Sequence, residues 1–197
     1  MTSKDVIMQM VHENKGTITA EQVSKAGLSR GSLKYLADKG LLMRSARGVY
    51  ILPEMWEDEL FNLQTRFKKG IFSLETALFL FDLTDRTPSR YHMTFPLGYN
   101  TTSLNSENVN YCRVKNDIYE LGVTTVKTPG NNWVRAYGIE RTLCDILKGR
   151  NHVDIQIISD AFKRYAKSKN KNIPLLSEYA KILRVEKKIR SYLEVLI

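Results

Sequence analysis

The strongest constraint on the fold is the pattern of residues 3–52, in which three short helical patterns precede two strand-like runs. The first helix is predicted over residues 3–14, where apolar residues recur on one face. The second is predicted over residues 20–25, because Thr19 and Gln22 have the spacing of a capping box at its start. The chain is therefore expected to begin with a small helical domain.

The third helix is predicted over residues 30–39, with Ser29 as its N-cap and Gly40 as its C-terminal stop. Leu33 and Leu36 recur at helical spacing and are expected to face the core. The polar side chains of this helix fall on its other faces. They are therefore expected to be open to a partner.

A β-hairpin is predicted directly after the third helix. Residues 41–44 and 49–52 are strand-like, and the loop 45–48 ends in Gly48, which can adopt a positive φ. A helix, a helix-turn-helix and a two-stranded wing make up a winged helix-turn-helix. Residues 1–52 are predicted to form such a domain.

A winged helix can bind DNA by placing its third helix in the major groove and its wing against the backbone or the minor groove. Candidate contacts are basic or hydrogen-bonding side chains on the third helix, on the wing and near the helix N-termini. These predicted DNA-binding residues are Thr17, Thr19, Ser29, Arg30, Ser32, Lys34, Tyr35, Arg44 and Arg47. Winged helices also serve as protein-interaction modules, so a protein partner remains an alternative.

Charge is spread unevenly along the 197 residues, whose formal net charge is +9. Residues 1–52 hold eight Lys and Arg against four Asp and Glu, and residues 141–197 hold thirteen against six. Residues 53–140 hold nine against eleven. Two basic ends favour nucleic acid or an acidic partner. The C-terminal basic surface is expected to add phosphate contacts, which would make DNA binding strongly dependent on salt.

Residues 53–197 are predicted to form a second, mixed domain. Two helices are expected first, over residues 54–68 and after a cap at Ser73. A small antiparallel sheet follows from strand-like runs at residues 91–95, 109–114, 123–127 and 133–137. Helices are then expected over residues 139–147, 153–167 and 174–197, the last broken near Arg184 and Val185. The predicted fold class is α+β.

Motifs for catalysis are not evident. Two cysteines and three histidines lie far apart, so no metal site and no disulfide framework are expected. The sequence holds no phosphate-binding loop, no dinucleotide fingerprint and no nucleophile elbow, so neither a cofactor nor an enzymatic role is expected. A nuclease or transferase would need metal-dependent turnover. Glu140 and Asp145, which flank Arg141, are expected to form ion pairs.

The apolar segments also bear on the cellular compartment. The richest apolar run, residues 74–83, is short and contains two acidic residues, so no membrane-spanning helix is expected. The N-terminus lacks the regions of a signal peptide. A soluble, cytoplasmic protein without a membrane partner is predicted.

Two motifs resemble a known family. The wing carries Arg47-Gly48-Val49-Tyr50, and the later helix carries Ile-Glu-Arg-Thr-Leu-Cys-Asp-Ile-Leu over residues 139–147. With a mixed segment between them, they resemble the AbiEi antitoxins of type IV, abortive-infection toxin–antitoxin systems. The resemblance extends over essentially the whole chain. The second motif departs from the family pattern at Ile146, which replaces a leucine.

This resemblance implies two activities. The winged helix of such proteins represses the antitoxin–toxin operon by binding inverted repeats at its promoter. The C-terminal domain neutralises a nucleotidyltransferase-like toxin without a stable complex. The match carries over to Arg47, Gly48 and Tyr50 on the wing, while Glu140, Arg141 and Asp145 are expected to be architectural. The alternatives are a protein-interaction module and a general transcriptional regulator without antitoxin activity.

Overall fold

The chain divides into two units, which are described separately. The computed structural model describes residues 2–196. The N-terminal unit runs to Lys68 and also takes in Pro129–Asn132, whereas the C-terminal unit holds Lys69–Thr128 and the residues from Trp133 onward.

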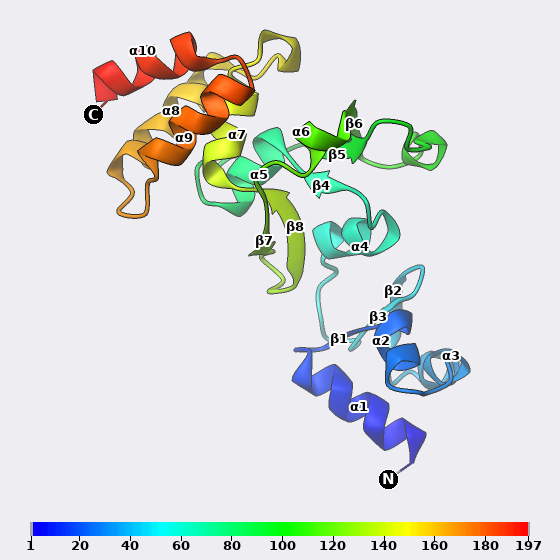
Figure 1. Ribbon diagram of the computed structural model, residues 1–197. Coiled ribbons are helices and arrows are strands. Elements are labelled where there is room, and N and C mark those ends of the chain that lie inside the picture. The colour runs from blue at the N-terminus through cyan, green and yellow to red at the C-terminus, as the bar shows by residue number, and fades with distance from the viewer. Residues whose placement is uncertain (1, 197) are drawn as a thin grey trace. The chain divides into compact units, whose positions relative to one another are not determined.

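The first two helices of the N-terminal unit begin where a side chain can satisfy their free amides (Figure 1). Helix α1 (Ser3–Glu13) has Thr2 as its N-cap, and α2 (Ala20–Lys25) has Thr19, each within a capping box. Helix α3 (Gly31–Asp38) starts one residue later than predicted. The predicted bounds of α2 are confirmed, and those of α1 hold to within one residue.

The same unit contains a three-stranded antiparallel sheet in the order β1-β3-β2. Strands β2 (Met43–Ala46) and β3 (Val49–Ile51) form the predicted hairpin, with an irregularity in register between Arg44 and Ala46. Strand β1 (Thr17–Thr19) was not predicted, because three residues are too few for an alternating pattern to be visible. It pairs with β3 and so connects the hairpin to the helices.

The core of this unit is aliphatic, and α1, α2 and α3 each contribute to it. The fully or almost fully buried members are Ile7, Val11, Ile18, Val23, Leu33, Leu36 and Leu42. The helix predicted over residues 54–68 is shorter than expected. Helix α4 spans Glu59–Arg66 because Asp58 caps it, accepting a hydrogen bond from the Phe61 amide at 3.0 Å.

The C-terminal unit contains a five-stranded sheet in the order β6-β5-β4-β8-β7. Its strands are β4 (Ile71–Phe72), β5 (Tyr91–Pro96), β6 (Val109–Val114), β7 (Val123–Lys127) and β8 (Trp133–Tyr137). The predicted antiparallel sheet is wrong, since β5 pairs with β6 and β4 with β8 in parallel. The other two pairings, β4 with β5 and β7 with β8, are antiparallel, so the sheet is mixed. The two-residue strand β4 was not predicted, and it lies between β5 and β8.

Helices cover this sheet and form most of the second core. They are α5 (Leu74–Leu80), α6 (Asn116–Tyr119), α7 (Ile139–Ile146), α8 (Ile155–Lys167), α9 (Ile173–Ile182) and α10 (Glu186–Leu196), with 3-10 turns η1 (Thr102–Leu104) and η2 (Gly149–Asn151). Helix α7 packs against α5, α8 and α9. The predicted break between α9 and α10 is confirmed at Arg184, whose φ is +59°. The α+β class is therefore confirmed.

Residues 2–196 hold neither a membrane-spanning helix nor a cluster of metal-binding side chains. No helix in this range is long and apolar enough to cross a membrane. The same residues contain no group of three or more His, Cys, Asp and Glu side chains that could hold a metal ion.

Candidate nucleic-acid interface

Helix α3 presents a polar surface opposite its buried face. Leu33 and Leu36 are fully buried, while Lys34 and Tyr35 are exposed and Ser32 is half-buried. Tyr35 keeps 55% of its surface accessible, and the Lys39 ammonium lies 5.9 Å from the centre of its ring. An exposed aromatic ring beside two lysines is a surface suited to contact with an anionic partner.

The start of α3 differs from the prediction. Arg30, not Ser29, occupies the N-cap position, and no side chain caps the helix from there. The Ser29 hydroxyl instead accepts a hydrogen bond from the Gly31 amide at 3.2 Å, two residues along the chain. This local turn takes the place of a cap. The Arg30 Nε donates to the Ser24 hydroxyl at 2.6 Å, and this bond links the start of α3 to α2.

The hairpin carries the two predicted wing arginines. Arg44 lies on β2, where its Nε donates to the Ala46 carbonyl at 3.4 Å. Arg47 is exposed in the turn between β2 and β3, and no residue in the described part of the chain forms an ion pair or hydrogen bond with its side chain. Gly48 follows with φ +79°, a conformation that favours glycine. The turn thus leaves the Arg47 guanidinium open to solvent.

The remaining two predicted contacts lie inside the unit. Thr17 and Thr19 are both 8% exposed on β1. The Thr19 hydroxyl accepts a hydrogen bond from the Gln22 amide at 3.2 Å, and the Gln22 side chain accepts one from the Thr19 amide at 2.7 Å. The structure therefore gives these two threonines little surface for a phosphate.

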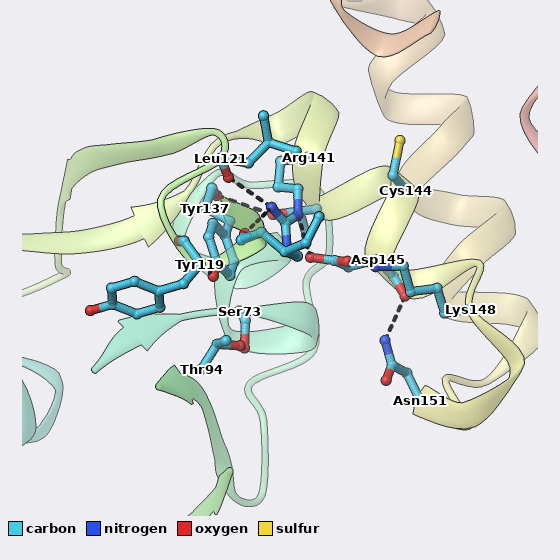
Figure 2. Close-up of polar contacts among 12 residues, drawn as sticks. Ser73, Thr94, Tyr119, Leu121, Tyr137, Arg141, Cys144, Asp145, Lys148 and Asn151 are labelled. Carbon is cyan, nitrogen blue, oxygen red and sulfur yellow. Dashed lines mark hydrogen bonds and ion pairs between the residues drawn. The ribbon is translucent and has the colours of Figure 1, made fainter. Parts of the chain in front are cut away.

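The second motif forms a buried polar cluster on α7 (Figure 2). Arg141 is 1% exposed, and its Nε donates to an Asp145 carboxylate oxygen at 2.8 Å. Its Nη1 donates to the carbonyls of Ile118 and Leu121, each at 2.8 Å, and the guanidinium carbon lies 4.3 Å from the ring centre of Tyr137. The expected pairing of Arg141 with Asp145 is confirmed.

Two further residues complete this cluster. Lys148 donates to the second Asp145 oxygen at 2.7 Å. This pair was not predicted, although a spacing of three residues between Asp145 and Lys148 is a signal for it. Glu140 accepts hydrogen bonds from the Tyr165 hydroxyl and the Asn172 amide at 3.1 and 3.2 Å, and not from Arg141. It therefore joins α7 to α8 and to the start of α9.

A glycine lets the loop before β7 reach this cluster. Gly122 has φ +71°, and a Cβ added there would lie 2.8 Å from the Cβ of Arg141. Any other residue would push the loop away from the guanidinium, and with it the Leu121 carbonyl that accepts from Arg141.

Comparison with known proteins identifies the N-terminal segment. Residues 5–53 match the AbiEi antitoxin family of transcriptional regulators. The AbiEi resemblance predicted from the sequence is therefore confirmed for this segment, which spans α1 to β3. The AbiEi match does not extend to residues 54–197. No curated protein matches the sequence.

A solved structure shares the fold over most of the chain. It is the crystal structure of the RV2827C protein from Mycobacterium tuberculosis, to which this chain is 15% identical. The TM-score is 0.55, and the alignment covers 89% of this chain and 70% of that chain. At this identity the likeness concerns the fold alone. It includes residues beyond the AbiEi segment.

Proposed function

We propose that residues 1–52 form a winged helix-turn-helix that binds double-stranded DNA and represses the operon from which the protein is expressed. The DNA would be the inverted repeats of its own promoter, one copy of the protein on each half-site. The family match at residues 5–53 carries this proposal, because that family consists of transcriptional regulators. The order of three helices and a three-stranded sheet supports it.

The exposed side chains of this unit support a proposed DNA contact for each of its elements. Helix α3 would enter the major groove, with Lys34 and Tyr35 toward the bases and with Arg30, Ser29 and Ser32 beside them. The hairpin would lie along the phosphates or the minor groove through Arg44 and Arg47. Since Thr17 and Thr19 are buried, their contribution would be to hold β1 and the start of α2 in place.

We further propose that residues 53–197 act as the antitoxin domain. The partner would be a nucleotidyltransferase-like toxin, neutralised without a stable complex. Support comes from the antitoxin description of the matched family and from the Arg141–Asp145 pair, which places the second AbiEi-like motif in the core of this unit. A toxin gene directly beside the gene for this protein would strengthen the proposal.

The test compares binding to DNA from upstream of the gene with binding to scrambled DNA. Fluorescence anisotropy of Lys34→Ala/Arg47→Ala is compared with that of Lys4→Ala/Lys15→Ala, a control that removes two exposed charges from α1 and the turn after it. The first variant is expected to weaken binding about 30-fold or more, because each lost contact costs about 1 kcal/mol or more. The control should bind within about threefold of the wild type, since long-range charge alone is screened by salt.

Salt dependence gives a second readout. Each phosphate contact contributes about 0.9 to the slope of log K against log salt, so losing one contact should lower the slope by about one. Equal, salt-labile binding to both DNAs would reduce the domain to a non-specific binder. Absence of binding would favour the protein-interaction alternative.

A further inference from the structure

A basic cavity of about 250 Å³ lies in the C-terminal unit beside the buried cluster of Figure 2. Its walls come from α7 and the turn after it, from the start of α5, and from strands β5 and β6. The residues that line it include four cationic ones, namely Arg113, Arg141, Lys148 and Arg150. Asp145 is the one carboxylate in the lining, so the formal charge of the cavity wall is +3.

The charges of this wall are only partly used within the protein. Asp145 is shared by Arg141 and Lys148. Arg113 and Arg150 are exposed, and neither forms an ion pair with any residue between 2 and 196. The ion pairs with Asp145 therefore explain Arg141 and Lys148, but they do not explain why two further arginines, Arg113 and Arg150, belong to the lining of the same cavity.

One hydrogen-bond donor group of Arg141, its Nη2, is not used within the described residues. Its Nε and Nη1 make three hydrogen bonds, to Asp145, Ile118 and Leu121. Its Nη2 has no hydrogen-bond partner within the described residues, and Arg141 lines the cavity. A buried guanidinium that is held by three hydrogen bonds and has one NH2 group left over is a preorganised donor for an anion, because no further side-chain ordering is needed.

Hydroxyl groups face the cations across the cavity. The Thr94 hydroxyl on β5 donates to Ser73 at 3.0 Å and lies 3.2 Å from the Cys112 sulfur on β6. Ser73 precedes α5, yet its side chain does not cap that helix. Ser73, Thr94 and Cys112 all line the cavity (Figure 2 draws the first two), so the cavity offers neutral hydrogen-bonding groups as well as positive charge.

We propose that this cavity binds the phosphate chain of a small ligand, of the class of inorganic oligophosphates and nucleoside di- and triphosphates. A wall charge of +3 exceeds what one carboxylate would neutralise, whereas a di- or triphosphate matches it. The volume lies just below the usual range for ligand pockets, which fits a phosphate chain and excludes a nucleic-acid duplex. The inference concerns the C-terminal unit and does not rest on the proposed function in DNA binding.

Cys112 provides a built-in reporter for this site. It is exposed and lines the cavity, whereas the other cysteine, Cys144, is fully buried. N-ethylmaleimide should therefore modify Cys112 first in the folded protein. Bound triphosphate should slow this reaction at least fivefold by filling the space beside the sulfur.

The affinity is measured by isothermal titration calorimetry with inorganic triphosphate, ATP and sulfate at constant ionic strength. Arg113→Gln/Arg150→Gln is compared with Lys169→Gln/Arg190→Gln, which removes two exposed charges elsewhere in the same unit. Both are surface changes and are expected to leave the fold intact. The first variant should weaken triphosphate binding about tenfold or more, because charge-assisted hydrogen bonds are the strong ones. The control should bind like the wild type.

The relative affinities for triphosphate and ATP show which part of the ligand is recognised. Similar affinities for triphosphate and ATP would mean that the phosphate chain alone is recognised, and tighter binding of ATP would add the nucleoside to the ligand. The proposal is overturned if triphosphate neither binds nor protects Cys112. Equal losses in the two double variants, or sulfate binding as tightly as triphosphate, would also overturn it, since either would indicate a general charge effect. Promoter-DNA binding by the same protein is measured independently of all these results.

Discussion

At the scale of single residues, the molecule places one cation where cations are rarely found. Arg141 is almost completely buried, and its charge is compensated by Asp145 and by two backbone carbonyls. Such a pair adds little net stability compared with apolar residues of the same size, but breaking it is costly. The main role of the cluster is therefore to hold the loop before β7 against α7, and its net contribution to the free energy of unfolding is small.

The cost of breaking the pair can be measured. Asp145→Asn keeps the shape of the side chain but leaves the Arg141 charge buried without its carboxylate, so the free energy of unfolding should fall by about 3 kcal/mol or more. Urea unfolding followed by circular dichroism measures this loss. Asp160→Asn is the control, since Asp160 pairs with Lys163 at 4.0 Å with both side chains more than half exposed, and should lose less than about 1 kcal/mol. Similar losses in both variants would contradict a structural role for the buried pair.

At the scale of elements, local chemistry made most of the fold predictable. A capping box predicted α2, and strand-like runs predicted β6, β7 and β8 with their observed bounds. The break near Arg184 was also predicted, and it is observed. What the sequence could not show was β4, because two residues carry no periodicity. The parallel pairings and the cavity depend on contacts between segments that lie far apart in the sequence, so neither could be found from spacing alone.

The capping box of α2 gives an element-scale prediction. Thr19→Ala removes the hydroxyl that accepts from the Gln22 amide, and Thr19 is only 8% exposed, so solvent has little access to this amide as a replacement partner. The free energy of unfolding should fall by about 1 kcal/mol. Thr19→Ser keeps the hydroxyl and should recover most of the loss in the same thermal or urea measurement. If Thr19→Ser were as destabilised as Thr19→Ala, the missing methyl group, not the cap, would explain the change.

At the scale of the whole molecule, the two units differ in where their cationic side chains lie. The N-terminal unit displays its cations on α3 and the hairpin, at the surface. The C-terminal unit gathers cations around a cavity and buries polar groups beneath them. The proposed DNA binding and the proposed phosphate binding therefore rest on different units, so each can be tested by substitutions in one unit only.

The buried hydroxyl and thiol groups predict how stability changes with pH. Burial raises the pKa of Cys144 from its usual 9.0 to about 12, and it raises the pKa of both Tyr137 and Tyr165 well above 10.0. These groups keep their protons in the folded state, while the unfolded chain releases them once the pH exceeds about 9 to 10. Above that point the folded state binds more protons than the unfolded state, so the free energy of unfolding must fall as pH rises.

The prediction is a free energy of unfolding that receives no pH dependence from these groups below about pH 8 and declines between about pH 9 and 12. Urea unfolding at several pH values measures it. Tyr165→Phe removes one of the titrating groups, so its decline above about pH 10 should be shallower than that of the wild type, even though losing the hydrogen bond to Glu140 lowers its stability at neutral pH. Tyr35→Phe, a change at an exposed ring on α3, should leave the profile unchanged. A slope that is the same in all three proteins would show that Tyr165 already titrates normally in the folded state.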